Sequence, residues 1–352
     1  MKAILLGQLP PPAGGIASWT KRMKTAELKN GWKTAVVDER VIGGREIFGE
    51  NTKKKLTVEA KRCFGIWKNL WKELRDKDAH IVHASIPAGF TGMMREAVCA
   101  LLTKARGRKF IIHFRCTLPY MVRDRKTHLM FRVLVSLSDA VIVLNSPSLA
   151  FVKERMPGKR AALIPNFVSA DEKIKDREYG AKNVTVLYVG GVTREKGCMD
   201  ILECAAKTPQ VAYRLAGAAD KEMKDVRLPG NVVLCGELDK DGVQKELRNA
   251  DVFLFASYFH GEGFSNALAE AMTGGLPCIV SDWAANADMI EGQGGYVAPV
   301  HGTEQMAAAV EKLSSNPDLR RKMGQWNQEK VERCYTQKRV TSRYVDLYEE
   351  IL

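Results

Sequence analysis

Two glutamates eight positions apart, Glu262 and Glu270, are the side chains in this sequence whose spacing points most directly to chemistry. Glu270 falls in a helical pattern that begins near Ser265 and is stopped by Gly274. Eight helical residues span at most about 12 Å, so the two carboxylates suit opposite ends of one extended ligand. Because carboxylates accept hydrogen bonds from vicinal hydroxyls, a sugar at one end and a ribose at the other would fit.

Small residues surround Glu262, with Gly261 before it and Gly263 and Ser265 after it. They let a ligand approach the backbone, and the N–H groups at the start of the next helix can hold a phosphate or sugar oxygens. The alternative interpretation is that Glu262 is a solvated loop residue and Glu270 a capping or surface carboxylate. The spacing alone does not decide between the two.

Two other strand-to-helix turns carry residues suited to phosphate. Arg194 and Lys196 lie in the turn after one predicted strand, where cations can neutralise a diphosphate or simply form a solvated basic turn. Gly14 and Gly15 follow the first predicted strand and permit close backbone approach. The sequence contains neither G-x-G-x-x-G nor a P-loop, so a dinucleotide fingerprint is absent and P-loop hydrolysis is disfavoured.

Histidines give no metal-ligand pattern. His113 and His83 each end a predicted strand, where a lone histidine is more often structural than functional. We therefore expect no required metal ion, because the basic turn and the helix start could take its place. The remaining histidines also lack ligand spacing: His80, His128, His260 and His301.

The elements that position these turns alternate between short β-branched runs and longer helical patterns, which favours parallel sheets covered by helices. The rhythm restarts after a polar stretch at residues 165–183, so we expect two doubly wound domains in series. Ligands of such folds bind beyond the carboxyl ends of the strands. The predicted strands are Lys2–Leu6, Thr34–Val37, Ile81–Ala84, Phe110–Phe114, Ala140–Leu144 and Ala161–Ile164, then Val184–Val189, Val211–Ala216, Val232–Cys235, Val252–Ala256, Cys278–Ser281 and Gly295–Val297.

The segment Ser257–Met272 closely resembles the E-x7-E signature of retaining glycosyltransferases, above all glycosyltransferase family 4. The likeness includes the flanking runs at 250–255 and 275–281; it covers nearly the whole chain but is specific only in the C-terminal half. It implies an α/β GT-B fold, in which two doubly wound Rossmann-like parallel-sheet domains face a cleft. Residues 1–168 would form the acceptor-side domain and residues 169–333 the donor-binding domain. A C-terminal helix at 334–352, within a helical pattern that runs from Val331 to Leu352, would pack back on the first domain.

The resemblance also implies roles for individual residues. Glu262, His113 and Lys196 would be catalytic: Glu262 and His113 would face the donor sugar, and Lys196 its diphosphate. Gly191 stands where the family usually has an arginine, and Arg194 could reach the phosphates instead. The implied donor-binding residues are Gly14, Gly15, Gly191, Arg194, Lys196, Gly263, Phe264, Ser265, Asn266 and Glu270.

The activity implied is retaining transfer of a sugar from a nucleotide-diphosphate sugar to a glycan or lipid-linked acceptor, in cell-surface polysaccharide biosynthesis, without a cofactor. One alternative is a GT-B epimerase or hydrolase of nucleotide sugars. A nucleic-acid-binding protein is a further alternative, but no recognition motif accompanies the basic charge, so we expect no nucleic acid partner.

Charge is unevenly divided along the chain. Residues 1–170 hold 31 Lys and Arg against 13 Asp and Glu, whereas residues 171–352 hold 23 against 28. A polyanionic partner is therefore expected for the first half only. Thr52–Arg75 combines basic residues with apolar residues at helical spacing, and it is either a core-packed helix with a solvated basic face or a contact with an anionic membrane. Pro119–Lys126, which mixes apolar and basic residues in a predicted loop, is a second candidate for the membrane contact.

The chain's cysteines form no C-x-x-C pair and lie mostly in apolar stretches, and no long apolar run is present. We therefore expect a cytoplasmic protein, with contact at the inner face of the membrane as the sharper hypothesis.

Overall fold

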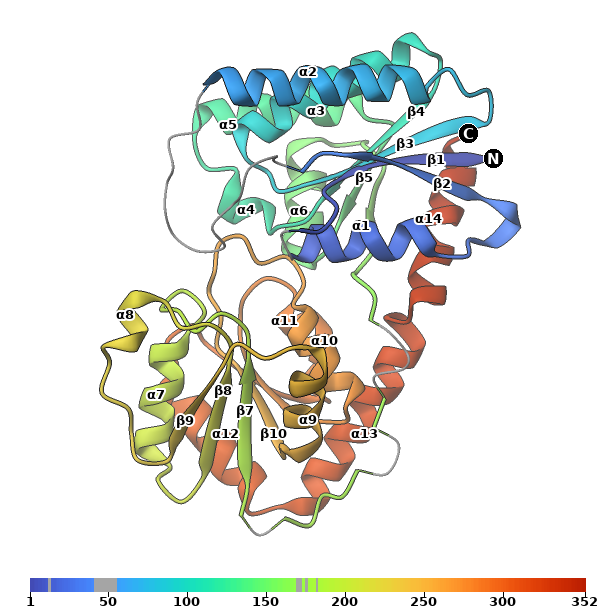
Figure 1. Ribbon diagram of the computed structural model, residues 1–352. Coiled ribbons are helices and arrows are strands. Elements are labelled where there is room, and N and C mark those ends of the chain that lie inside the picture. Colours follow the sequence, from blue (N-terminus) through green and yellow to red (C-terminus); the bar gives the residue numbers. More distant parts are fainter. Residues whose placement is uncertain (12–13, 41–55, 169–172, 175–176, 182) are drawn as a thin grey trace. The chain divides into compact units, whose positions relative to one another are not determined.

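The computed structural model describes residues 1–11, 14–40, 56–168, 173–174, 177–181 and 183–352, which form two compact α/β units (Figure 1). Unit 1 comprises Met1–Asn166 and Lys338–Leu352, and unit 2 comprises Phe167–Gln337. The sequence predicts these boundaries after residues 168 and 333.

Unit 1 is built on a six-stranded parallel sheet with the order β2-β1-β3-β4-β5-β6. Each strand is short, and most are apolar and buried, as expected for parallel strands covered on both faces. All six predicted strands of this half are present. They are β1 (Lys2–Gly7), β2 (Lys33–Asp38), β3 (Ala79–Ile86), β4 (Lys109–Phe114), β5 (Ala140–Val143) and β6 (Ala161–Leu163).

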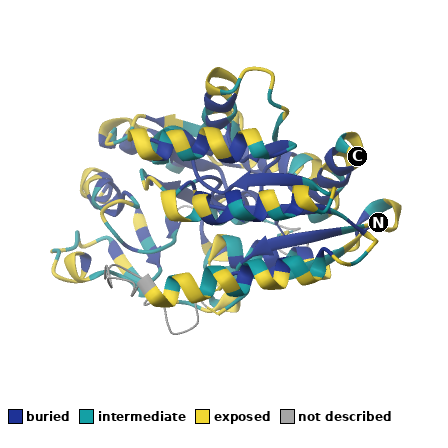
Figure 2. Ribbon diagram, turned by 90° about the horizontal axis from the view of Figure 1, so that it is seen from above, coloured by how far each residue is buried: buried dark blue, intermediate teal, exposed yellow. Residues whose placement is uncertain are grey.

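Alternation along these strands separates two faces. Ile4 and Leu6 point into a core shared with α2, α3 and α5. Buried and exposed residues alternate along the surface helices in Figure 2, as expected for helices with one side packed on a sheet. The opposite face, which includes His83 and His113, meets α1 and α14. The helices of unit 1 are α1 (Gly15–Thr25), α2 (Leu56–Glu73), α3 (Phe90–Ala105), α4 (Leu118–Met121), α5 (Arg125–Leu137), α6 (Ser146–Arg155) and α14 (Gln337–Ile351).

Unit 2 repeats the plan with a parallel sheet of order β12-β11-β10-β7-β8-β9. Its predicted strands are also all present, as β7 (Thr185–Val189), β8 (Ala212–Ala216), β9 (Val232–Gly236), β10 (Val252–Phe255), β11 (Cys278–Ser281) and β12 (Gly295–Ala298). The helices are α7 (Cys198–Lys207), α8 (Lys221–Lys224), α9 (Lys240–Asn249), α10 (Asn266–Thr273), α11 (Asn286–Ile290), α12 (Thr303–Ser314) and α13 (Pro317–Cys334). In β10 and β7, which are neighbours in the sheet, parallel pairing brings the two carboxyl ends to one edge.

The prediction of one helix over Val331–Leu352 is wrong. Helix α13 ends at Cys334, and Tyr335 leaves the helical conformation with φ of −120° and ψ of 3°. The carbonyl of Tyr335 accepts a hydrogen bond from the amide of Val168 at 2.9 Å, and its ring packs edge-on against Phe264 at 5.3 Å. These long-range contacts break a continuous helical pattern, and α14 begins afresh at Gln337.

The prediction of a loop at Pro119–Lys126 is also wrong. Its first residues belong to α4, and Asp124 caps the next helix by accepting hydrogen bonds from the amides of Lys126 and Thr127 at 2.8 and 2.9 Å. The predicted basic helix over Thr52–Arg75 is present as α2, while residues 52–55 lie outside the described residues.

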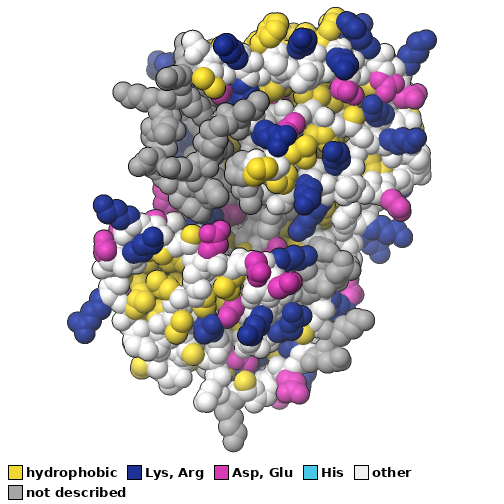
Figure 3. Space-filling model, in the orientation of Figure 1, with side chains coloured by type: hydrophobic (Ala, Val, Ile, Leu, Met, Phe, Trp, Pro, Cys, Tyr) yellow, Lys and Arg dark blue, Asp and Glu magenta, His cyan; other side chains and the backbone are white. Residues whose placement is uncertain are grey.

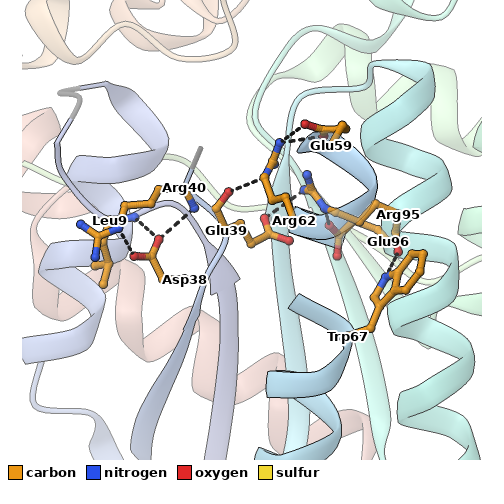
Figure 4. Close-up of polar contacts among 9 residues, drawn as sticks. All are labelled: Leu9, Asp38, Glu39, Arg40, Glu59, Arg62, Trp67, Arg95 and Glu96. Carbon is orange, nitrogen blue, oxygen red and sulfur yellow. Dashed lines mark hydrogen bonds and ion pairs between the residues drawn. The ribbon is translucent and has the colours of Figure 1, made fainter. Parts of the chain in front are cut away.

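A cluster of buried charges lies at the carboxyl end of β2 (Figure 4). Arg95, on α3, donates to Glu96 at 2.8 Å and to Glu39 at 3.0 Å, and all three side chains are buried. Arg62, on α2, donates to the carbonyl of Glu39 at 3.1 Å. Burial and the neighbouring charge of Glu96 raise the pKa of Glu39 well above its usual range, while Arg95 opposes that rise. One guanidinium therefore serves two buried carboxylates.

Candidate active site

An ion pair joins the two strand-to-helix turns that carry the predicted donor site in unit 2. Lys196 Nζ lies 2.6 Å from Glu262 Oε2, and the side chains are 23% and 12% exposed. Lys196 follows β7, and Glu262 follows β10, its neighbour in the sheet. Glu262 is therefore not a solvated loop residue: a mostly buried carboxylate and a cation meet beyond the carboxyl ends of two central strands.

Backbone contacts hold the two turns together. The amide of Tyr258 donates to the carbonyl of Glu195 at 3.0 Å. Gly197 has a φ of +74°, and a Cβ at this position would lie 2.1 Å from the carbonyl oxygen of Ala256. Only glycine combines this left-handed backbone with so close an approach. The placement of Lys196 beside Glu262 therefore depends on a glycine at position 197.

Replacing Gly197 with alanine should destabilise unit 2 by about 2 kcal/mol, because the new Cβ meets backbone and the left-handed conformation is strained. Chemical denaturation measures the change. Gly230→Ala is the matched control, since a Cβ there meets nothing within 4 Å, and it should stay within about 0.5 kcal/mol of the parent. Equal stability of the two variants would contradict the role assigned to Gly197.

Aromatic residues shape the Glu262 turn. Lys196 Nζ lies 4.6 Å from the centre of the Phe259 ring. The carbonyl of Phe259 accepts hydrogen bonds from the amide of Glu262 at 2.9 Å and from Trp283 Nε1 at 2.8 Å. The cation thus lies over an aromatic face on one side and against a carboxylate on the other.

Helix α10 begins directly after this turn. Ser265 caps it by accepting a hydrogen bond from the amide of Leu268 at 3.2 Å, and the Phe264 side chain is buried against Tyr335. Both side chains are therefore structural, which leaves backbone amides as the groups these two residues could offer a ligand. Glu270 is half-buried within the same helix, so the structure places both predicted glutamates on one loop–helix unit.

Arg194 and Gly191 make their hydrogen bonds to residues other than Lys196 and Glu262. Arg194 Nε donates to Glu222 at 2.8 Å, at the exposed helix α8. The carbonyl of Gly191 accepts a hydrogen bond from the Tyr188 hydroxyl at 2.8 Å. Arg194 is engaged away from Lys196 in this structure, and its substitution for the family arginine at Gly191 stays a prediction.

In unit 1, His113 belongs to a buried hydrogen-bonded chain. Arg115 can only donate, and its Nη1 lies 3.2 Å from Nε2 and 3.5 Å from Nδ1 of His113. His113 Nδ1 lies 3.1 Å from His83 Nε2, and His83 Nδ1 lies 2.6 Å from the Tyr348 hydroxyl. These contacts tie α14 to β3 and β4.

Both histidines are neutral. Burial, together with the charge of Arg115, lowers the pKa of His83 to about 3, and the same causes lower the pKa of His113 well below its usual range. Because His113 is completely buried here, a contact with a donor sugar stays a prediction. Gly14 and Gly15 form the start of α1, also in unit 1, while residues 12–13 lie outside the described residues.

Sequence reasoning missed Arg115, which lies two residues after His113. This guanidinium is 8% exposed and stacks over Trp19 at 4.9 Å. Its Nη2 has no hydrogen-bond partner among the described residues, and burial lowers its pKa to about 10. The neighbours that bury it, Trp19 on α1 and Tyr344 on α14, are distant in sequence, so no local pattern signals the environment.

Among the residues that the structure describes, no group of three or more His, Cys, Asp or Glu side chains could hold a metal ion. In the same part of the chain, no helix is long and apolar enough to cross a membrane.

The two doubly wound sheets define the GT-B fold, and solved structures agree. Sucrose-phosphate synthase from Thermosynechococcus elongatus superposes with a TM-score of 0.77 at 16% identity, covering 99% of this chain and 98% of that one. Anabaena HepE in complex with UDP-glucose superposes with a TM-score of 0.70 at 14% identity, covering 99% and 100%. At these identities the likeness concerns the fold.

Residues 169–330, which make up nearly all of unit 2, match the family model of the glycosyl transferases group 1. The N-acetyl-alpha-D-glucosaminyl L-malate synthase of Bacillus anthracis is 24% identical over 296 residues, or 77% of this chain and 74% of that protein. The phosphatidyl-myo-inositol mannosyltransferase of Mycobacterium leprae is 28% identical over 209 residues, or 55% and 54%. The chain therefore aligns with about half the length of this second relative.

Proposed function

We propose that this protein is a retaining glycosyltransferase that moves a sugar from a nucleotide-diphosphate sugar to a hydroxyl of a glycan or lipid-linked acceptor. The observation that carries the proposal is the ion pair between Lys196 and Glu262, at the carboxyl ends of neighbouring strands in a glycosyl transferases group 1 segment. It supplies one cation for a diphosphate and one carboxylate for sugar hydroxyls at the same place.

In the proposed reaction, the donor diphosphate draws Lys196 away from Glu262, and Glu262 then accepts hydrogen bonds from the sugar. The acceptor oxygen forms a bond to the anomeric carbon as the bond to the diphosphate breaks, on the same face of the sugar. The departing phosphate takes the acceptor's proton. Lys196 and the amides at the start of α10 stabilise the charge that develops on the diphosphate, so the proposal needs no metal ion or cofactor.

Similar proteins support this donor and acceptor chemistry. HepE is described in complex with UDP-glucose, and the Mycobacterium leprae relative is named for transfer of mannose to a phosphatidylinositol. We place the reaction on the cytoplasmic side, at the inner face of the membrane, and we propose a role in cell-surface polysaccharide synthesis. An epimerase or hydrolase of nucleotide sugars is the second candidate, since it could use the same Lys196–Glu262 pair.

A ligand that binds only the folded protein stabilises it by an amount that grows with the logarithm of its concentration once that exceeds the Kd. We expect a uridine or guanosine diphosphate sugar to raise the midpoint temperature of thermal unfolding. At one hundred times its Kd, the ligand should add about 2.7 kcal/mol to the free energy of unfolding. The matching nucleoside monophosphate is the control, because it lacks both the sugar and the second phosphate. Failure of every nucleotide sugar to stabilise the protein would contradict the proposal.

Product analysis separates the two candidate reactions. A transferase should consume its donor slowly alone and faster when an acceptor hydroxyl is supplied. Rapid turnover of the nucleotide sugar that does not depend on an acceptor would favour the epimerase or hydrolase.

A further inference from the structure

The outward side of the helix layer α2, α3 and α5 in unit 1 has an unusual composition. Along α2 and just past its end, exposed residues recur every three or four positions, as expected for one stripe of a helix. They are Thr57, Lys61, Phe64, Lys68, Lys72 and Arg75. Four of these six residues are cations, and none is acidic.

The same bias extends across all three helices. Their acidic residues are Glu59, Glu73 and Glu96; none is exposed, and they pair with Arg62, Lys2 and Arg95 respectively. The exposed charged residues are all cations, namely Lys61, Lys68, Lys72, Lys104, Arg125, Lys126 and Arg132. In Figure 3, Lys and Arg side chains stand among hydrophobic ones along the top edge, where Figure 1 places α2.

Large apolar side chains are exposed between these cations. Phe64 on α2 is 66% exposed and Leu129 on α5 is 64% exposed. Seven of the twelve exposed large apolar residues in the described part of the chain lie on these three helices: Val58, Phe64, Phe90, Met94, Leu101, Leu129 and Val133. The three found in unit 2, Val233, Phe259 and Val297, lie on strands or loops, so the bias is not a general property of the surface helices.

We infer that this outward face, the α2-α3-α5 face, is a docking surface for an anionic lipid bilayer. Lysines and arginines are attracted to acidic headgroups, while exposed Phe, Leu, Val and Met side chains gain by entering the boundary with the acyl chains. A second copy of the chain fits poorly, because two such faces would bring like charges together. Nucleic acid would engage the cations but would leave the apolar side chains without a matching surface.

The inference deepens the proposed function and rests on it only in that a bilayer-bound enzyme suits a lipid-linked acceptor. Binding to lipid is measured without turnover, so the two proposals can fail separately. If the protein does not bind vesicles but is stabilised by a nucleotide sugar, the docking surface is refuted and the proposed transferase activity is retained.

The test is co-sedimentation with vesicles of phosphatidylcholine alone or mixed with phosphatidylglycerol. We expect binding only to the mixed vesicles, and weaker binding as salt rises. The triple variant K61Q/K68Q/K72Q should bind at least about tenfold more weakly. Its matched control, K224Q/K245Q/K322Q, removes the same charge from exposed positions of unit 2 and should bind like the parent.

A second variant tests the apolar component. F64Q/L129Q keeps every charge, removes two exposed apolar side chains and should also weaken binding, while remaining sensitive to salt. Thermal unfolding of each variant checks that the fold is intact. Equal loss in both lysine triples, or unchanged binding by F64Q/L129Q together with displacement by an oligonucleotide, would overturn the inference, because either result describes a general polyanion attraction.

Discussion

Exchanging Lys196 for methionine should lower kcat/KM for sugar transfer by about 10²- to 10³-fold and leave the fold intact. The ammonium group lies 2.6 Å from Glu262, and methionine keeps most of the side chain's length over the Phe259 ring. Glu262→Gln should have an effect of similar size, because an amide keeps the shape but cannot offer a carboxylate to sugar hydroxyls. Steady-state kinetics with saturating acceptor measure both effects.

Arg194→Met is the matched control for this experiment. It removes a cation from the same turn, but one that pairs with exposed Glu222 on α8, so a change within about threefold is expected if Lys196 is the residue that serves the diphosphate. The double variant of Lys196 and Glu262 should lose less than the product of the two single losses, because each single change already breaks the ion pair between the two residues. Near-normal transfer by both single variants would remove this pair from the active site.

The strands could be predicted because each one is a short apolar or β-branched run of consecutive residues. Val252–Phe255 is a short apolar run buried on both faces, and the turn after it contains the glycines and the glutamate that mark a ligand site. A local pattern is sufficient for the strand and its turn. The ion pair to Lys196 depends on the order of the sheet, in which β10 and β7 are neighbours, and no local pattern gives that order.

Features made by contacts between distant segments could not be predicted. The break at Tyr335 depends on Val168 and Phe264, and the hydrogen-bonded chain through His83 and His113 depends on Arg115 and Tyr348. No periodicity in α14 indicates that one of its tyrosines will close a histidine chain. The same is true of Glu39 and Arg95, which are 56 residues apart and meet only in the folded unit.

Replacing Arg95 with methionine should lower the free energy of unfolding by about 3–5 kcal/mol. The guanidinium bonds to both Glu39 and Glu96, so its loss leaves two carboxylates in the protein interior with no cation between them. Arg62→Met is the control, because it removes a neighbouring guanidinium whose partner Glu59 is less buried, and about 1 kcal/mol is expected. Urea unfolding of the three proteins at one pH gives the comparison.

The loss should also depend on pH, with a sign fixed by Glu39. Its pKa is raised in the folded protein by burial and by Glu96, so the folded state holds a proton that the unfolded state releases near pH 4.3. Stability therefore falls as pH rises from that value through the folded pKa. Without Arg95 the folded pKa rises further, and the deficit of Arg95→Met should grow between pH 5 and about pH 8. Adding Glu39→Gln should recover part of the lost stability at the higher pH, since it removes one of the uncompensated charges. A deficit that is equal at pH 5 and about pH 8, and that Glu39→Gln leaves unchanged, would mean that Arg95 stabilises unit 1 by packing alone.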